Sequence, residues 1–133
     1  MARTSSETSK EDIVVWRRLV NEYLEAFAAR DIPRCLALFD ADAVIDFQMS
    51  SFNGREEIAD WHADRFAANL RVLQVERVRV NGDTVQVDAI VASDRLAAWR
   101  IASLRARATL RFVGGRIVSV VLAPRLNPMG AYG

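Results

Sequence analysis

Residues 22–46, EYLEAFAARDIPRCLALFDADAVID, change hydrophobic pattern twice within one short stretch of the chain. The first part continues a stripe of apolar residues at steps of three and four, which predicts an amphipathic helix over residues 9–30. Asp31 and Pro33 suit the start of a second, short helix, because the missing N–H of proline costs nothing there. Apolar and polar residues alternate over residues 43–48, which predicts a strand. The stretch therefore predicts a helix, a short helix and a strand, in that order.

The chain that follows predicts one more helix and a set of strands. Residues 50–54 have turn composition and precede a third helix over residues 55–70. Residues 81–83 (Asn-Gly-Asp) and 114–115 (Gly-Gly) mark tight hairpins, because asparagine and glycine adopt positive φ at low cost. The expected strands cover residues 73–80, 84–92, 99–113 and 116–123, with residues 94–97 as a connection. Three helices followed by local hairpins predict an α+β fold, with the helices folded over a curved antiparallel sheet.

Length and composition fit one globular unit. The chain has 133 residues, 51% of them hydrophobic, so we expect a single domain over residues 1–133. Its core spans about residues 9–123, between a short polar N-terminal segment and a C-terminal tail. No apolar run approaches the roughly 18 residues of a membrane span, and the polar start lacks the apolar segment of a secretory signal. We therefore expect a cytoplasmic protein with no membrane partner.

Cysteine and histidine are too scarce for the common structural cross-links. Cys35 is the only cysteine and His62 the only histidine, so we expect neither an internal disulfide nor a zinc site. Cys35 fits a small buried apolar side chain better than a nucleophile, since no base lies near it in sequence. The prediction is a protein without metal or cofactor.

Charge is segregated along the chain, although the formal net charge is only +1. All 17 acidic residues lie at or before Asp94, whereas residues 95–133 hold seven arginines. Such an asymmetry can mark a nucleic-acid surface, but a basic stripe without interleaved aromatic residues is a weak signal for one. We expect no nucleic-acid partner. The basic strands instead pair with acidic helices or with acids of a second subunit.

The long strand predicted near the C-terminus has two unlike faces. One face presents apolar residues and has two small ones, Ala106 and Ala108, between Leu104 and Leu110. Small residues there either let a helix approach closely or leave a cavity, and under three helices on a curved sheet we favour a cavity. The other face presents Arg105, Arg107 and Arg111 outward. That outer sheet face is a candidate interface for a homodimer.

Residues 22–46 resemble the opening of the nuclear transport factor 2-like superfamily, which includes ketosteroid isomerases, limonene epoxide hydrolases and SnoaL-like polyketide cyclases. Two further motifs match, Gly54-Arg-Glu-Glu-Ile58 before the third helix and Gly114-Gly-Arg-Ile-Val118 before the last strand. The resemblance covers about residues 9–123. It implies a cystatin-like cone, in which three N-terminal helices pack on a curved antiparallel sheet that encloses a pocket. It does not imply one activity, because the superfamily places its chemistry at different residues.

The resemblance to ketosteroid isomerases carries over only in part. Their hydrogen-bond donor to the substrate falls on Tyr23, and the residue that orients this donor falls on His62. The phenol would donate to a substrate oxygen and the imidazole would position the phenol. The general-base position falls on Phe47, next to Asp46 on the opposite face of the strand, and the second donor position falls on Ala108. Limonene epoxide hydrolases need an Asp-Arg-Asp arrangement that this sequence lacks.

The sequence leaves three functions open. The first is a SnoaL-like isomerase, cyclase or hydratase that acts on a carbocyclic or polyketide-like substrate by acid–base chemistry without metal. The second is a module that binds a hydrophobic ligand without turnover, and the third is a dimerization domain. Each candidate residue also has a structural alternative, such as a core aromatic side chain, a buried hydrogen-bonding group or an exposed acid. The catalytic candidates are Tyr23, His62 and Asp46. The substrate-binding candidates are Trp16, Phe27, Phe47, Ile58, Trp61, Ala106, Ala108 and Leu110.

Overall fold

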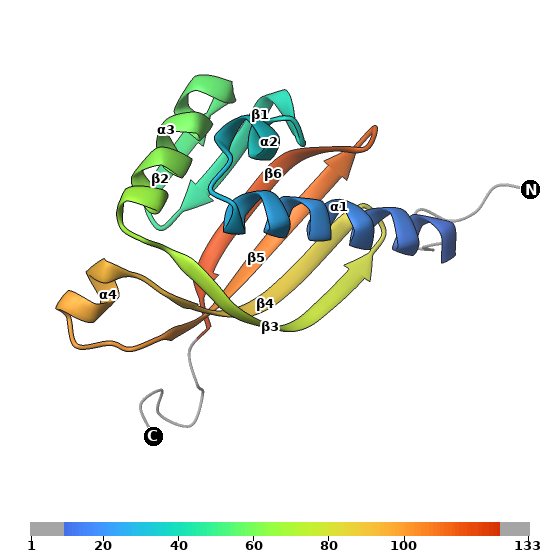
Figure 1. Ribbon diagram of the computed structural model, residues 1–133. Coiled ribbons are helices and arrows are strands. Elements are labelled where there is room, and N and C mark those ends of the chain that lie inside the picture. The colour runs from blue at the N-terminus through green and yellow to red at the C-terminus, as the bar shows by residue number, and fades with distance from the viewer. Residues whose placement is uncertain (1–9, 126–133) are drawn as a thin grey trace, which may run out of the picture.

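The computed structural model describes residues 10–125 as helices packed on one side of a single sheet (Figure 1). Its elements are α1 (Lys10–Ala28), α2 (Ile32–Leu36), β1 (Phe39–Phe47), β2 (Ser50–Asn53), α3 (Gly54–Ala67), β3 (Arg71–Asn81), β4 (Thr84–Ala92), α4 (Asp94–Ala98), β5 (Leu104–Val113) and β6 (Arg116–Pro124). The α+β prediction is confirmed, and the predicted helices and hairpins are present in the predicted order.

The sheet has six strands in the order β2-β1-β6-β5-β4-β3 and is not closed. Neighbouring strands pair antiparallel except for β1 and β6, which pair parallel. The sequence predicted a wholly antiparallel sheet because hairpins reveal only pairings between consecutive strands. The parallel pair instead joins the first strand of the chain to the last. In Figure 1, α1 crosses the sheet over its later strands, and α3 lies over the end formed by β1 and β2.

Several boundaries differ from those expected, each for a local reason. β1 begins at Phe39, because the segment that was expected to end the second helix pairs with Ile117 on β6. Residues 50–53 form β2 rather than a turn, since they pair back on β1. The connection at residues 94–97 is the short helix α4, whose first turn is capped by the Ser93 hydroxyl accepting from the Leu96 N–H. β5 begins only at Leu104, after this helix has ended.

The motif at residues 54–58 joins α3 to the rest of the fold. Gly54 has φ +80°, a backbone conformation that glycine adopts without a Cβ penalty. Arg55 donates to the carbonyl oxygens of Leu36 and Phe39, and so ties α3 to the end of α2 and the start of β1. The Asn53 N–H donates to the Glu57 carboxylate at 2.8 Å, which satisfies a free donor at the N-terminus of the helix. The motif therefore fixes the position of the start of α3 relative to α2 and β1.

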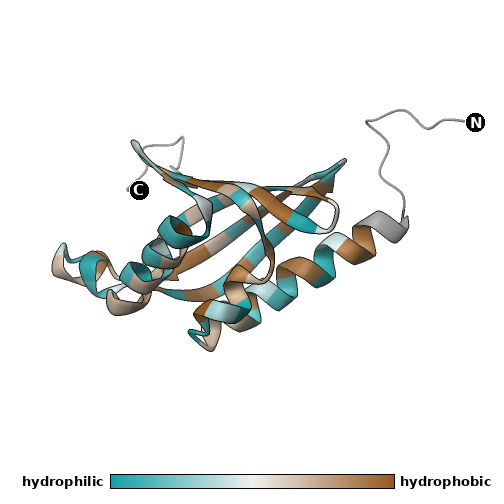
Figure 2. Ribbon diagram, turned by 90° about the horizontal axis from the view of Figure 1, so that it is seen from above, coloured by the Kyte–Doolittle hydropathy of each residue, from teal (hydrophilic) through white to brown (hydrophobic). Residues whose placement is uncertain are grey.

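The core lies between the helices and the concave face of the sheet. Apolar and polar residues alternate along the strands in Figure 2. The buried apolar residues of the strands form one cluster with those of the helices. The largest completely buried apolar side chains are Phe39, Phe112, Ile45, Ile58 and Ile117. Within residues 10–125, no helix has both the length and the apolar character needed to cross a membrane.

Candidate functional site

A cavity of about 610 Å³ lies between the helices and the concave face of the sheet. Its walls are mainly apolar, as is usual for sites that take small organic molecules. Seven of the predicted site residues line it, namely Tyr23, Phe27, Phe47, Trp61, Ala106, Ala108 and Leu110. They come from α1, β1, α3 and β5, so the fold gathers residues from distant parts of the sequence around one space.

The floor of the cavity is made of small side chains on two paired strands. Ala89 on β4 pairs with Ala106 on β5, and Val87 pairs with Ala108. All four residues line the cavity. Because no long side chain rises from this part of the sheet, the space between the strands and the helices stays unfilled. The alanines therefore account for the cavity that the sequence favoured at this position.

Tyr23 and His62 form a hydrogen-bonded pair, with the phenol oxygen 2.7 Å from the imidazole Nε2. His62 is completely buried on α3, and its Nδ1 lies 2.8 Å from the carbonyl oxygen of Ile58. A carbonyl can only accept, so Nδ1 carries the proton and donates to it. In the neutral imidazole, Nε2 then accepts from the Tyr23 hydroxyl. While the phenol donates to His62 it cannot also donate to a substrate oxygen, which is the role that the family resemblance implied.

Burial keeps both members of the pair uncharged. Loss of solvent lowers the pKa of His62, although the hydrogen bond to Ile58 acts in the opposite direction. Burial likewise raises the pKa of Tyr23 well above its usual range. Around neutral pH the pair is therefore a phenol that donates to a neutral imidazole. The cavity-lining Tyr23 oxygen keeps lone pairs that can accept a hydrogen bond from a ligand.

Arg65 is a cavity residue that the sequence reasoning missed. It lies on α3 four residues after Trp61, and both side chains line the cavity. Its guanidinium carbon lies 4.6 Å from the centre of the Phe47 ring and 5.6 Å from that of Trp61. The signal was present in the i, i+4 spacing, which places Arg65 on the same helix face as Trp61. It was passed over because only the apolar residues of that face were considered.

The outer part of the cavity wall comes from α4 and the residues after it. Trp99 lines the cavity and is 80% exposed, so it lies at the boundary between cavity and solvent. Arg95 also lines the cavity and donates to both carboxylate oxygens of Asp64, at 2.8 and 3.2 Å. This ion pair ties α4 to α3. The sequence predicted residues 94–97 as a connection and Trp99 as the first residue of a strand, so it did not predict that a helix contributes to this wall.

Four of the predicted site residues are not part of the cavity lining: His62, which lies behind Tyr23, and three others. The Asp46 side chain accepts a hydrogen bond from the Ser51 hydroxyl, on the strand face opposite the cavity-lining neighbours Ile45 and Phe47. Trp16 stacks on Phe112 and donates from its indole N–H to the carbonyl oxygen of Gly82. Ile58 is fully buried in the core. The structure thus brings together Tyr23 and His62 but not Asp46.

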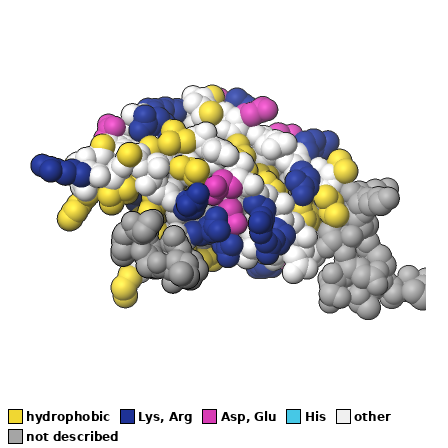
Figure 3. Space-filling view, turned by 90° about the horizontal axis from the view of Figure 1, so that it is seen from below, with side chains coloured by type: hydrophobic (Ala, Val, Ile, Leu, Met, Phe, Trp, Pro, Cys, Tyr) yellow, Lys and Arg dark blue, Asp and Glu magenta, His cyan; other side chains and the backbone are white. Residues whose placement is uncertain are grey.

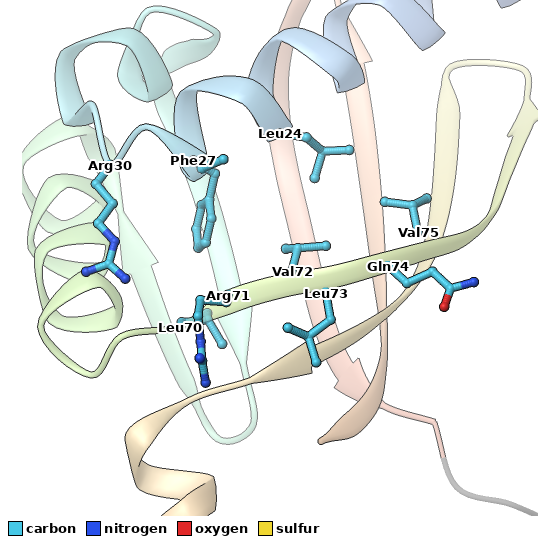
Figure 4. Close-up of a pocket in the computed structure, with 10 residues that line it drawn as sticks. Leu24, Phe27, Arg30, Leu70, Arg71, Val72, Leu73, Gln74 and Val75 are labelled. Atoms are coloured by element: carbon cyan, nitrogen blue, oxygen red, sulfur yellow. The ribbon is translucent and has the colours of Figure 1, made fainter. Parts of the chain in front are cut away.

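A second, smaller cavity of about 430 Å³ lies beside the first, between α1 and β3. Figure 4 shows Leu24 and Phe27 reaching from α1 toward Val72 on β3. These three residues and Leu70 line both cavities, so the two spaces share one wall. The shared wall is apolar, which extends the surface available to a hydrophobic molecule.

The polar groups around the main cavity limit its chemistry. No carboxylate and no imidazole is among the described residues that line it. Nor does any group of three or more His, Cys, Asp or Glu side chains within the described chain suit a metal ion. The groups left for chemistry or recognition are donors and acceptors, above all the Tyr23 hydroxyl, the Trp61 indole and the Arg65 guanidinium. His62 can exchange a proton with the cavity only through Tyr23.

Solved structures of other proteins have a similar fold. The fold is similar to that of a proposed polyketide cyclase from Sinorhizobium meliloti, with TM-score 0.71 and 22% identity over 80% of this chain and 94% of that one. It is also similar to a ketosteroid isomerase-like protein from Catenulispora acidiphila in complex with trimethylamine, with TM-score 0.67 and 22% identity over 79% and 83% of the two chains.

A third similar structure is an NTF2-like protein from Anabaena variabilis, with TM-score 0.73 and 14% identity over 91% of this chain and 96% of that one. At these identities the likeness is one of fold. No curated protein matches the chain. The SnoaL-like domain, however, matches residues 20–120, which run from the second half of α1 to the first part of β6. The chain therefore belongs to the SnoaL-like family, and its fold is NTF2-like.

Proposed function

We propose that the protein binds a small apolar molecule, of carbocyclic or polyketide-like structure, in the cavity between the helices and the sheet. The observation that carries the proposal is the cavity itself, about 610 Å³ with mainly apolar walls and a few polar groups. The absence of a cavity carboxylate among the described residues favours binding over the base chemistry of an isomerase. The likeness to a proposed polyketide cyclase supports the choice of ligand class.

A thermal-shift titration with 2-naphthol and 2-tetralone tests the proposal. A ligand at about one hundred times its dissociation constant stabilises the folded state by roughly 2.7 kcal/mol, which raises Tm by several degrees. The Ala108→Phe variant fills the cavity floor and should lose most of the shift. Ala63→Phe, at an exposed position of α3 outside the cavity, is the matched control and should keep it. No shift in the parent, or an equal shift in Ala108→Phe, would refute the proposal.

The Tyr23–His62 pair favours a second function, acid–base catalysis of the isomerase, cyclase or hydratase kind. An α-proton of a bound ketone passes to the Tyr23 oxygen while the Tyr23 proton passes to Nε2 of His62. The electron pair of the C–H bond forms the enolate, and the positive charge resides on the imidazole. Return of the proton to another carbon completes an isomerisation. The lowered pKa of His62 makes that imidazolium short-lived and favours the return.

Deuterium exchange distinguishes catalysis from binding alone. In D2O the parent protein should accelerate exchange of the α-protons of 2-tetralone, followed by NMR. Tyr23→Phe removes the only relay between His62 and the cavity, so exchange should fall to the uncatalysed rate while the thermal shift with the same ligand persists. Equal exchange in parent and variant would exclude the relay and leave ligand binding as the function.

The proposal includes a homodimer formed through the outer face of the sheet and a cytoplasmic location. The outer face carries Arg77, Arg105, Arg107 and Arg125 around the acids Glu76 and Asp88. Both signs of charge are present there, so a copy that docks with an offset finds complementary partners. The cytoplasm suits a chain whose single cysteine is a buried free thiol.

A further inference from the structure

Two hydrogen-bond donors on α3 have no acceptor in the part of the chain that the structure describes. The indole Nε1–H of Trp61 and the Nε–H of Arg65 are both buried without a partner. The Trp61 side chain is only 5% exposed, and both residues line the main cavity. A buried donor left without an acceptor costs about 1–3 kcal/mol, so such groups are uncommon outside functional sites. Two of them one helical turn apart, on residues that both line the cavity, point to a ligand that accepts hydrogen bonds.

The charge of Arg65 is also incompletely matched. Its guanidinium face lies over the Phe47 ring, but stacking of this kind leaves the N–H groups at the edge of the plane free to donate. The nearest acid is Asp64, with 3.4 Å between Asp64 Oδ2 and Arg65 Nη2. Asp64 already accepts two hydrogen bonds from Arg95 and remains 47% exposed. Arg65 therefore presents a cation, and its unpartnered Nε–H, beside a cavity with no described acid in its lining.

We propose that the natural ligand of the cavity is an apolar carboxylic acid, whose carboxylate accepts from Arg65 Nε–H and Trp61 Nε1–H while its hydrocarbon body fills the apolar space. The inference rests on the proposed ligand-binding function and names the ligand class. A carboxylate has two oxygens for the two donors, and a hydrogen bond between charged partners is about twice as strong as a neutral one. Tyr23 complements this arrangement, because its oxygen can accept from a hydroxyl elsewhere on the ligand.

A pair of isosteric probes tests the inference without any substitution. Isothermal titration at pH 7.5 compares 2-naphthoate with 2-naphthamide, which has the same shape but no charge. We expect the carboxylate to bind at least about tenfold more tightly, the difference that one charge-assisted contact of roughly 1.4 kcal/mol supplies. Equal affinities, or tighter binding of the amide, would overturn the inference.

Substitutions then assign the donors. Arg65→Gln should abolish the preference for 2-naphthoate over 2-naphthamide, while 2-naphthamide still binds. Trp61→Phe should reduce the same preference. Arg79→Gln removes the same charge at an exposed position outside the cavity and should keep the parental preference. A preference that survives in Arg65→Gln would overturn the role of Arg65.

The outcome also separates this inference from the proposed function. Binding of 2-naphthol and of both naphthalene probes with equal affinity would leave the cavity as a ligand site and refute only the carboxylate. Failure of all three molecules to bind would refute the ligand site and the inference together.

Discussion

At the scale of single residues, the protonation of His62 follows from its two hydrogen bonds. Nδ1 must donate to the Ile58 carbonyl oxygen, which leaves Nε2 to accept from Tyr23. A protonated imidazole would have to donate from both nitrogens, so the Tyr23 hydroxyl would have to turn away from it. The completely buried site therefore prefers the neutral ring, in agreement with the lowered pKa of His62.

The stability of the fold should depend on pH below the ordinary histidine pKa of 6.5. As the pH falls through 6.5, His62 takes up a proton in the unfolded chain but stays neutral in the folded protein. The free energy of unfolding therefore decreases. The slope for one proton is at most about 1.4 kcal/mol per pH unit. Urea denaturation between pH 5 and pH 8 measures this slope. His62 is the only histidine in the sequence, so no other histidine contributes to the slope.

His62→Gln is the matched control for this pH dependence. Glutamine can donate to Ile58 and accept from Tyr23 without titrating, so its unfolding free energy should stay nearly constant between pH 5.5 and pH 7. An equal slope in the variant would show that His62 is not the group responsible.

At the scale of elements, the outer face of the sheet is organised around a buried carboxylate. Asp88 on β4 is only 4% exposed and receives hydrogen bonds from Arg107 on β5 at 2.8 and 3.2 Å. Arg125, just beyond β6, lies 3.6 Å from the same carboxylate. The Arg107 hydrogen bonds lower the pKa of Asp88, so the carboxylate stays charged. Figure 3 shows one face on which arginine side chains gather around a few acids.

If this face forms the dimer, association should weaken as salt is added. Sedimentation velocity over a range of protein concentrations should give a dissociation constant that rises with NaCl, because salt screens charges between the two copies. Arg105→Glu should change that constant by on the order of tenfold, since Arg105 is exposed and its one ion pair within residues 10–125 is with Glu76. Arg18→Glu, at an exposed position of α1, is the control and should leave it unchanged. A monomer at every concentration, or a dimer indifferent to salt and to Arg105→Glu, would exclude the charged interface.

At the scale of the whole molecule, arginines and acids that are separated in the sequence lie next to one another in the fold. Arginines from the last part of the chain pair with acids from earlier parts, as in Arg95 with Asp64, Arg105 with Glu76 and Arg107 with Asp88. The pairing accounts for much of the asymmetry without a nucleic-acid partner. It also shows that the excess of arginine late in the chain serves to attach late elements to earlier ones.

The fold could be predicted from local patterns, whereas the site could be predicted only in part. Helical spacing, period-two alternation and the Asn81–Asp83 turn are all properties of neighbouring residues, and each appears in the structure. The parallel pairing of β1 with β6 has no local signature, and was missed. Trp61 was identified because it is apolar, and the spacing of Arg65 places it on the same helix face. That the buried N–H of Arg65 lacks an acceptor depends on what surrounds it in space, which no sequence pattern shows.

The pairing of β1 with β6 also affects how the protein folds during its synthesis on the ribosome. Residues such as Ile45 and Val120 are partners in the sheet, yet the first is translated long before the second. Until the last strand leaves the exit tunnel, β1 can pair only with the short β2, and the two helices before β1 lack a completed sheet to pack on. A nascent chain that waits in this way exposes apolar surface and an open strand edge, which invite aggregation. The topology therefore makes completion of the sheet a late event, because β1 can join the other strands only through β6.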